Sequence, residues 1–172
     1  MKKRSIEKIR LLLLDVDGVL TDGRIIYDNN AVESKAFHVR DGHGLKLLQR
    51  AGIKVGIITG RSSAVVSHRA AELGIDIVYQ GAKNKLEPYE QILADLNLSD
   101  QQVAYVGDDL VDLPILRRVG CSIAVADAVA DIKPYVDYIT ALPGGHGAVR
   151  EVCDMLLRQS GLWDSVTERY FD

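Results

Sequence analysis

Short apolar runs alternate along this chain with longer segments of helical periodicity. The runs that predict buried strands are residues 10–16, 54–59, 76–79, 103–106, 122–125 and 138–140. The segments that predict helices are residues 44–50, 63–73, 86–96, 113–119 and 148–159. This alternation is typical of βαβ units, so it predicts an α/β fold: a Rossmann-like, doubly wound and mostly parallel sheet with helices on both faces.

One segment interrupts the alternation after the first strand. Residues 24–27 and 35–39 flank Asp28-Asn29-Asn30, which predicts an inserted β-hairpin over about residues 24–39. We find no second domain or repeat in the pattern and expect one domain over residues 1–172. Its C-terminal tail, about residues 160–172, is expected to be weakly tethered. The tail aromatics Trp163, Tyr170 and Phe171 would be exposed on a monomer, which favours a subunit contact.

Composition excludes several partners. The 172 residues are 47% apolar, enough for a core, and the net charge of −3 with no basic block argues against nucleic acid. No apolar run is long enough to span a membrane, and the run after Met1–Arg4 is too short for a signal peptide. Cys121 and Cys153 have no metal-like spacing, and we expect them to be small buried hydrophobes in a reducing cytoplasm.

Two carboxylates, Asp15 and Asp17, follow the apolar run 11–14 and precede Gly18. In an open α/β sheet, ligands bind at the carboxyl ends of the strands, so this pair is placed for chemistry. One acid can attack while the other moves protons, and a hard cation such as Mg²⁺ would reduce their repulsion. The alternative is a strand end followed by an ordinary Asx turn.

Thr59-Gly60-Arg61-Ser62-Ser63 follows the second core strand, where hydroxyl and backbone N–H groups can hold a phosphate. The alternative for the hydroxyl residues is helix capping, and Arg61 alone is more often a surface charge. Lys85, before the third core helix, is placed to neutralise a phosphate, although an isolated lysine usually faces solvent.

A second acidic cluster follows the fourth core strand. Asp108 stands nearest the strand tip in Gly107-Asp108-Asp109, and Asp112 lies farther on. The sequence therefore favours Asp108 as a cation ligand. For Asp109 and Asp112 the simpler explanation is a favourable position at a helix N-terminus.

These four signals, in chain order from Asp15 to Asp112, resemble the four motifs of the haloacid-dehalogenase superfamily of phosphatases. The resemblance implies that Asp15 attacks phosphorus to form an aspartyl-phosphate, and that Asp17 protonates the leaving alcohol and then activates water. It implies a Mg²⁺ cofactor held by Asp15, the backbone carbonyl of Asp17, and Asp108. It further implies phosphoryl binding by Thr59, Gly60 and Lys85, with Asp109 and Asp112 orienting the metal ligands and Lys85.

The chain resembles small members of that superfamily in which the hairpin replaces a cap domain. The similarity extends through Asp41-Gly42, Asn84-Lys85-Leu86 and residues 144–151. It implies a homotetramer whose hairpins build a central barrel, a tail that reaches a neighbouring site, and a phosphorylated sugar acid as substrate. In relatives that act on a nine-carbon, sialic-acid-like 9-phosphate, glutamate typically stands where this chain has Arg61. Arg61 therefore favours an eight-carbon acid phosphate of lipopolysaccharide precursor synthesis, and arginine suits the substrate carboxylate because it binds through two parallel hydrogen bonds.

His146 stands where some relatives have arginine, which leaves its role open. A noncatalytic tetrameric binding module is the competing hypothesis. The presence of both Asp15 and Asp17 argues against it, because binding alone needs neither a nucleophile nor a proton carrier.

Overall fold

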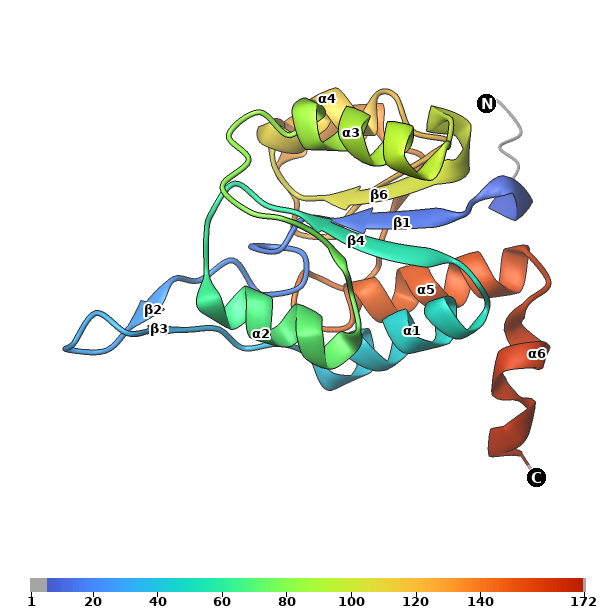
Figure 1. The fold of residues 1–172 in the computed structure, drawn as a ribbon, viewed down its shortest axis with the longest axis horizontal. Coiled ribbons are helices and arrows are strands. Elements are labelled where there is room, and N and C mark those ends of the chain that lie inside the picture. Colours follow the sequence, from blue (N-terminus) through green and yellow to red (C-terminus); the bar gives the residue numbers. More distant parts are fainter. Residues whose placement is uncertain (1–5, 172) are drawn as a thin grey trace.

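A parallel sheet forms the centre of the computed structural model, which describes residues 6–171; Met1–Arg4, Ser5 and the last residue of the predicted tail, Asp172, lie outside the described part. The strand order is β5-β4-β1-β6-β7-β8 (Figure 1). All five neighbouring pairs are parallel. The strands are β1 (Leu11–Leu14), β4 (Lys54–Ile58), β5 (Ile77–Tyr79), β6 (Val103–Gly107), β7 (Cys121–Ala124) and β8 (Tyr138–Ile139). The predicted α/β fold and all six predicted strands are confirmed.

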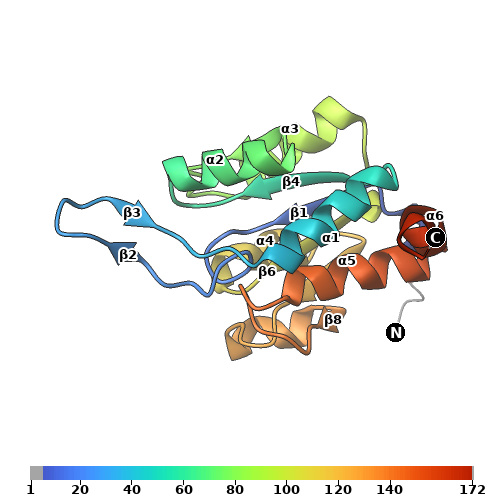
Figure 2. The ribbon, with the colours of Figure 1, turned by 90° about the horizontal axis from the view of Figure 1, so that it is seen from below.

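Helices cover both faces of this sheet. They are α1 (Val39–Arg50), α2 (Ala64–Leu73), α3 (Leu86–Leu96), α4 (Leu113–Leu116), α5 (Ala148–Gln159) and α6 (Trp163–Thr167). Short 3-10 helices occur at Ile6–Lys8, Asp100–Gln102, Leu110–Asp112, Ala130–Tyr135 and Glu168–Tyr170. Figures 1 and 2 show α1, α2 and α5 on one face, with α3 and α4 on the other. From β1 the chain adds β4 and β5 on one side, and it then crosses back to add β6 on the other side of β1. The direction in which strands are added therefore reverses beside β1, and open α/β sheets bind ligands at such a position.

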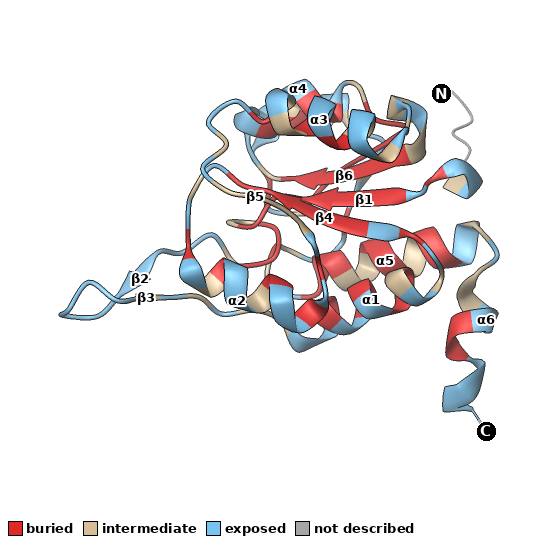
Figure 3. Ribbon diagram, viewed as in Figure 1, coloured by how far each residue is buried: buried red, intermediate tan, exposed pale blue. Residues whose placement is uncertain are grey.

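The central strands are apolar on both faces, and Figure 3 shows them buried between the helix layers. All four leucines of β1 are 0% exposed, as expected for a strand covered on both sides. Each such side chain contributes about 1.5 to 3 kcal/mol when fully buried. Cys121 and Cys153 are also buried, as predicted. This rigid layer fixes the strand ends that carry the polar residues.

Helix α1 begins at Val39, five residues before the predicted start. Gly42 and Gly44 lie inside it, and glycine normally weakens a helix interior. Their lack of a side chain favours close packing: a Cβ at Gly42 would lie 3.1 Å from Leu73 Cδ2 in α2, and one at Gly44 would lie 3.0 Å from Cys153 Cβ in α5. The glycines therefore permit close contact with α2 and α5, which local propensity does not reveal.

The inserted hairpin consists of β2 (Ile26–Tyr27) and β3 (Glu33–Ser34), and it projects from the body of the molecule (Figure 1). Its turn is at the predicted place, where the Asp28 carboxylate accepts hydrogen bonds from the backbone of Asn30 (2.9 Å) and Val32 (2.8 Å). The second strand of the hairpin is predicted over residues 35–39, and this is wrong: β3 begins at Glu33, two residues earlier, and ends at Ser34. The turn closes at Asp28, so pairing begins earlier in the chain. Among the described residues, no cap domain is inserted.

The C-terminal segment is more firmly attached than the sequence indicates. It forms α6, in which Val166 and Thr167 are buried, and Arg50 of α1 donates a hydrogen bond to the Val166 carbonyl (3.2 Å). Trp163 is half-buried under Arg158, whereas Tyr170 and Phe171 are exposed as expected.

Helix α4 ends at Leu116, earlier than the predicted Val119. None of the described helices is both long and apolar enough to cross a membrane.

Candidate active site

The carboxyl ends of β1, β4 and β6 meet at one edge of the sheet. Leu14, the last residue of β1, pairs with Ile57 of β4 and with Val106 of β6. This register puts the residues that follow the three strands at the same level. Asp15 and Asp108 therefore come together although they are far apart in the sequence.

A cavity of about 400 Å³ opens at this edge. It is lined by Asp15, Asp17, Thr59, Gly60, Arg61, Ala82, Lys83, Lys85, Asp108, Asp109 and Val111. Every predicted site residue except Asp112 is in this set. Asp112 is fully buried, and it contacts the cavity residues Lys85 and Asp108.

The Asp15 carboxylate is buried and held from two sides. Its Oδ1 accepts a hydrogen bond from the backbone N–H of Val16 (2.7 Å), and its Oδ2 lies 2.9 Å from Lys85 Nζ. Burial, followed by the negative charge of Asp112, raises the pKa of Asp15 to about 6, although Lys85 opposes the rise. A fixed, largely buried carboxylate that faces the cavity is suited to nucleophilic attack on phosphorus.

The turn after β1 carries Asp17 and depends on Gly18. Gly18 has a φ of +89°, and a Cβ there would lie 2.1 Å from Asp108 Oδ2. The Thr21 hydroxyl accepts hydrogen bonds from the backbone of Gly18 (3.4 Å) and Gly23 (3.2 Å), which closes the turn. The glycine thus lets the two acidic segments approach each other, while the Asp17 side chain stays 20% exposed at the cavity.

Lys85 is buried between carboxylates, not turned to solvent. Its Nζ donates to Asp112 Oδ1 (2.7 Å), which also accepts from the Tyr105 hydroxyl (2.6 Å). Burial alone would lower the pKa of Lys85, but the charges of Asp112 and Asp15 raise it above its ordinary value. Lys85 is therefore a fixed positive charge at the cavity, which a phosphate needs.

Asp112 is saturated with hydrogen bonds. Its Oδ2 accepts from the backbone N–H groups of Asp108 (3.0 Å) and Asp109 (3.3 Å), while Oδ1 holds Lys85 and Tyr105. The carboxylate of Asp109 instead accepts from the Leu110 N–H (2.6 Å). Of the two predicted orienting residues, it is Asp112 that contacts Lys85.

Three carboxylates crowd this edge of the sheet. Asp15, Asp108 and Asp112 each offer an oxygen within 4.8 Å of the others. Asp108 Oδ1 is buried with no hydrogen-bond partner among the described residues, and burial together with the charges of Asp112 and Asp15 raises the pKa of Asp108 to about 7. Since Asp112 is saturated, Asp15 and Asp108 have oxygens available for a hard divalent cation, and such a cation would relieve their repulsion.

The Thr59–Ser63 turn divides between the two predicted roles. Thr59 is buried and Gly60 is exposed, and both line the cavity. Ser63 follows the alternative interpretation: its hydroxyl caps α2 by accepting from the Val66 N–H (3.4 Å), and its own N–H donates to Gln80 (2.7 Å). Thr59 and Gly60 line the cavity, where a phosphate could reach them, whereas Ser63 does not line it.

Arg61 lies at the cavity beside Asp17, its Nε 3.8 Å from Asp17 Oδ2. Its Nη2 donates to the Tyr27 hydroxyl (3.0 Å) and to Glu33 Oε1 (3.4 Å), both in the hairpin. Lys35, which follows β3, forms an ion pair with Asp17. The sequence analysis missed these hairpin residues. The signal available in the sequence is the spacing of Glu33 and Lys35, because residues two apart in a strand share one face.

The loop before α5 packs against the turn after β1. Gly145 donates a backbone hydrogen bond to the Val19 carbonyl (3.0 Å), and a Cβ at Gly144 would lie 1.7 Å from the Gly18 carbonyl oxygen. His146 turns back to its own loop, with Nδ1 2.8 Å from the Gly144 carbonyl. Gly144 and Gly145 thus brace the turn that holds Asp17.

Comparisons with known proteins identify relatives of this chain. Residues 37–120 match a family model described as haloacid dehalogenase-like hydrolase. The chain is 52% identical over 158 residues to the 3-deoxy-D-manno-octulosonate 8-phosphate phosphatase of Escherichia coli K12, covering 92% of this chain and 84% of that protein.

Two solved structures share the fold. The crystal structure of 3-deoxy-D-manno-octulosonate 8-phosphate phosphatase from Yersinia pestis is 48% identical with a TM-score of 0.91, covering 92% of this chain and 86% of that one. The phosphatase of the same name from Moraxella catarrhalis, in complex with a magnesium ion, a phosphate ion and a KDO molecule, is 43% identical with a TM-score of 0.93, covering 96% and 95%.

Proposed function

Because this chain belongs to the haloacid dehalogenase-like hydrolases, and within them to the 3-deoxy-D-manno-octulosonate 8-phosphate phosphatases, we propose a substrate and a reaction. The substrate is 3-deoxy-D-manno-octulosonate 8-phosphate, which the protein hydrolyses to the free sugar acid and phosphate. The observation that carries the proposal is the buried Asp15 carboxylate, which faces the cavity while paired with Lys85. This pair provides a nucleophile and a positive charge for the phosphoryl group at one place.

In the proposed reaction, the Asp15 carboxylate attacks phosphorus and the bond to the sugar oxygen breaks. Asp17 gives a proton to that oxygen and later takes one from the water that attacks the aspartyl-phosphate. This second step releases phosphate and restores Asp15. The Thr59 hydroxyl, the Gly60 N–H and the Lys85 ammonium offset the charge of the transferring phosphoryl oxygens, where most of the catalysis of phosphoryl transfer originates.

We propose Mg²⁺ as the cofactor, held by Asp15, Asp108 and the backbone carbonyl of Asp17. The bound ion supplies positive charge against the carboxylates and the phosphate. The unpartnered Asp108 Oδ1 supports this assignment, and so does the magnesium ion in the Moraxella catarrhalis phosphatase. Asp112 positions Lys85 and the Asp108 backbone, and Asp109 closes the turn that follows.

Arg61 is proposed to bind the carboxylate of the sugar acid. Its guanidinium lies at the cavity, and a planar fork matches a carboxylate through two hydrogen bonds. Tyr27 and Glu33 hold it from the hairpin side, so Arg61 is aimed before substrate arrives. The preference for the eight-carbon acid rests on the resemblance, because nine-carbon phosphatases typically have glutamate where this chain has Arg61.

The test is phosphate release from 3-deoxy-D-manno-octulosonate 8-phosphate and from the nine-carbon 9-phosphate, each with Mg²⁺ and with excess chelator. We expect metal-dependent release with a clear preference for the first. Preference for the second would move the assignment to the nine-carbon substrate. No release from either would favour the noncatalytic binding module.

We also propose a homotetramer in which the hairpins form the shared contact. Its support is the exposure of hairpin apolar side chains: Ile25 is 51% exposed, Tyr27 55% and Val32 58%. Light scattering after gel filtration should give about four times the chain mass, and replacing Ile25 and Val32 with Ser should reduce it. A monomeric wild-type protein would contradict the proposal.

We propose that the reaction belongs to lipopolysaccharide precursor synthesis in the cytoplasm of a Gram-negative bacterium. The protein's proposed binding partner is a small phosphorylated sugar acid, and neither a nucleic acid nor a membrane. The similarity to phosphatases of Escherichia coli and Yersinia pestis supports this place. Deleting the gene should cause the sugar-acid phosphate to accumulate, measured by mass spectrometry of cell extracts. Unchanged levels would contradict it.

A further inference from the structure

Lys35 is a buried cation at the base of the hairpin. Only 1% of its side chain is exposed, although the hairpin itself projects into solvent. Glu33 and Lys35 are both half-buried as residues, and their neighbours Ser34 and Ala36 are exposed, so the strand turns one face toward the body of the protein. Burying an ammonium group is unfavourable in free energy unless the group is paired, so the partners of Lys35 indicate its role.

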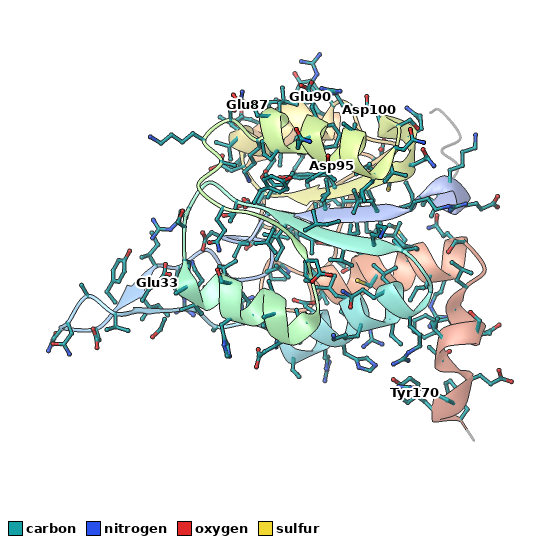
Figure 4. The ribbon with its side chains drawn as sticks, in the orientation of Figure 1. Glu33, Glu87, Glu90, Asp95, Asp100 and Tyr170 are labelled. Atoms are coloured by element: carbon teal, nitrogen blue, oxygen red, sulfur yellow. The ribbon has the colours of Figure 1, made fainter. Side chains whose placement is uncertain are left out.

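Those partners are Asp17 and Glu33. Lys35 Nζ forms an ion pair and hydrogen bond with Asp17 Oδ1, and it lies 3.4 Å from Glu33 Oε1. Glu33 is itself fixed, because the Ser63 hydroxyl at the start of α2 donates to its Oε2. Figure 4 shows Glu33 at the base of the hairpin, next to the beginning of α2. A chain of contacts thus runs from a rigid helix end through the hairpin to Asp17.

Lys35 does not line the cavity, whereas Asp17 does. It therefore has no direct access to a substrate in the cavity and can influence the reaction through the Asp17 carboxyl group. The other oxygen of Asp17, Oδ2, faces Arg61 Nε at 3.8 Å. Both oxygens therefore lie beside cations, but only Lys35 donates a hydrogen bond to the Asp17 carboxylate, whereas Arg61 is at ion-pair distance.

We propose that Lys35 is a positioning residue that fixes the Asp17 carboxyl group for proton transfer, with Glu33 fixing Lys35 in turn. The inference rests on the proposed function, in which Asp17 carries protons. Each acid of the pair has its own lysine: Lys85 holds the nucleophile Asp15, and Lys35 holds Asp17. The hairpin therefore contributes to catalysis within its own subunit, separately from any contact with neighbouring subunits.

A double-mutant cycle tests this assignment. The variants are Lys35→Met, Asp17→Asn and the double variant, and kcat and KM are measured with Mg²⁺ for the sugar-acid 8-phosphate and for p-nitrophenyl phosphate. Lys35→Met should lower kcat by roughly 10²-fold, the cost of a misplaced catalytic group, and should change KM little. In the Asp17→Asn background it should add no further loss, since a residue acting through Asp17 has nothing left to position.

Two further variants separate positioning from folding. Lys35→Arg keeps the charge and should recover part of the lost kcat, whereas Glu33→Gln should give a smaller loss that also disappears in the Asp17→Asn background. Lys46→Met removes an exposed lysine of α1 outside the cavity and is the matched control. Thermal unfolding of each variant shows whether the native fold is kept.

The outcomes distinguish this inference from the proposed function. Losses from Lys35→Met and Asp17→Asn that multiply in the double variant would overturn the positioning role, as would an undiminished kcat in Lys35→Met. If Asp17→Asn kept full activity, the proposed mechanism would fail as well. Turnover of p-nitrophenyl phosphate without turnover of the sugar-acid phosphate would overturn the substrate alone. With the aryl substrate the cycle still tests Asp17 in the attack of water on the aspartyl-phosphate, although p-nitrophenolate needs no proton to leave.

Discussion

Replacing Asp108 with Asn should stabilise the metal-free protein at pH 8. Burial and the charges of Asp112 and Asp15 raise the pKa of Asp108 from 3.8 to about 7. Between these two values, the folded protein holds a proton that the unfolded chain has lost. The stability of the metal-free protein therefore falls as the pH rises from about 4 to about 7, and a neutral side chain at position 108 removes that loss.

The magnitude follows from the shift. A rise from 3.8 to about 7 corresponds, at about 1.36 kcal/mol for each pKa unit, to about 4 kcal/mol at pH 8. Part of this free energy is the mutual repulsion of Asp108 and Asp15, which does not belong to Asp108 alone. We therefore expect the free energy of unfolding to increase by about 2 to 4 kcal/mol. For a chain of this size, that is a rise in Tm of roughly 5 to 15 °C.

Thermal and urea unfolding at pH 5 and pH 8, in excess chelator, measure this effect. The gain should be large at pH 8 and should shrink at pH 5, where wild-type Asp108 is protonated. Added Mg²⁺ should stabilise the wild type far more than Asp108→Asn. Asp95→Asn, at an exposed position of α3 outside the cavity, is the control and should show no such pH dependence. An Asp108→Asn variant no more stable than the wild type at pH 8, or a gain equal at both pH values, would refute the reasoning.

Three other substitutions test the site. Asp15→Asn should abolish phosphate release while the native fold is kept, because it removes the nucleophile at nearly constant volume; any substantial turnover would exclude the aspartyl-phosphate route. Asp17→Asn should lower kcat by about 10²- to 10⁴-fold, and an unchanged rate would remove Asp17 from proton transfer. Gly144→Ala places a Cβ 1.7 Å from the Gly18 carbonyl oxygen and should cost about 1 to 3 kcal/mol in urea unfolding; wild-type stability would contradict the close packing.

Much of the fold was predictable because its signals are local. Each core strand is a short apolar run, and each connecting helix has its own periodicity, so element order and the parallel sheet follow. The ends of elements were less predictable. Helix α1 begins at Val39 because Gly42 and Gly44 pack against other helices, and that compensation lies in distant residues. The attachment of the tail through Arg50 to Val166 is equally nonlocal.

The candidate site was predictable for those residues that directly follow the carboxyl end of a core strand. Asp15, Thr59 and Asp108 are placed by the sheet itself, since the carboxyl ends of parallel strands share an edge. Residues of the same chemical type could not be ranked this way. Asp112 and Asp109 look equivalent in sequence, yet one holds Lys85 and the other caps Leu110.

The sequence by itself therefore determined the architecture, the acid pair and the order of the polar turns, because strand periodicity and strand-end placement are encoded by neighbouring residues. The tertiary structure alone decided which partners those groups meet. It paired Lys35 with Asp17 and left Asp108 Oδ1 without a partner among the described residues. Such contacts depend on the path of the hairpin and on the packing of separate elements, which no local pattern of hydrophobic and polar residues specifies.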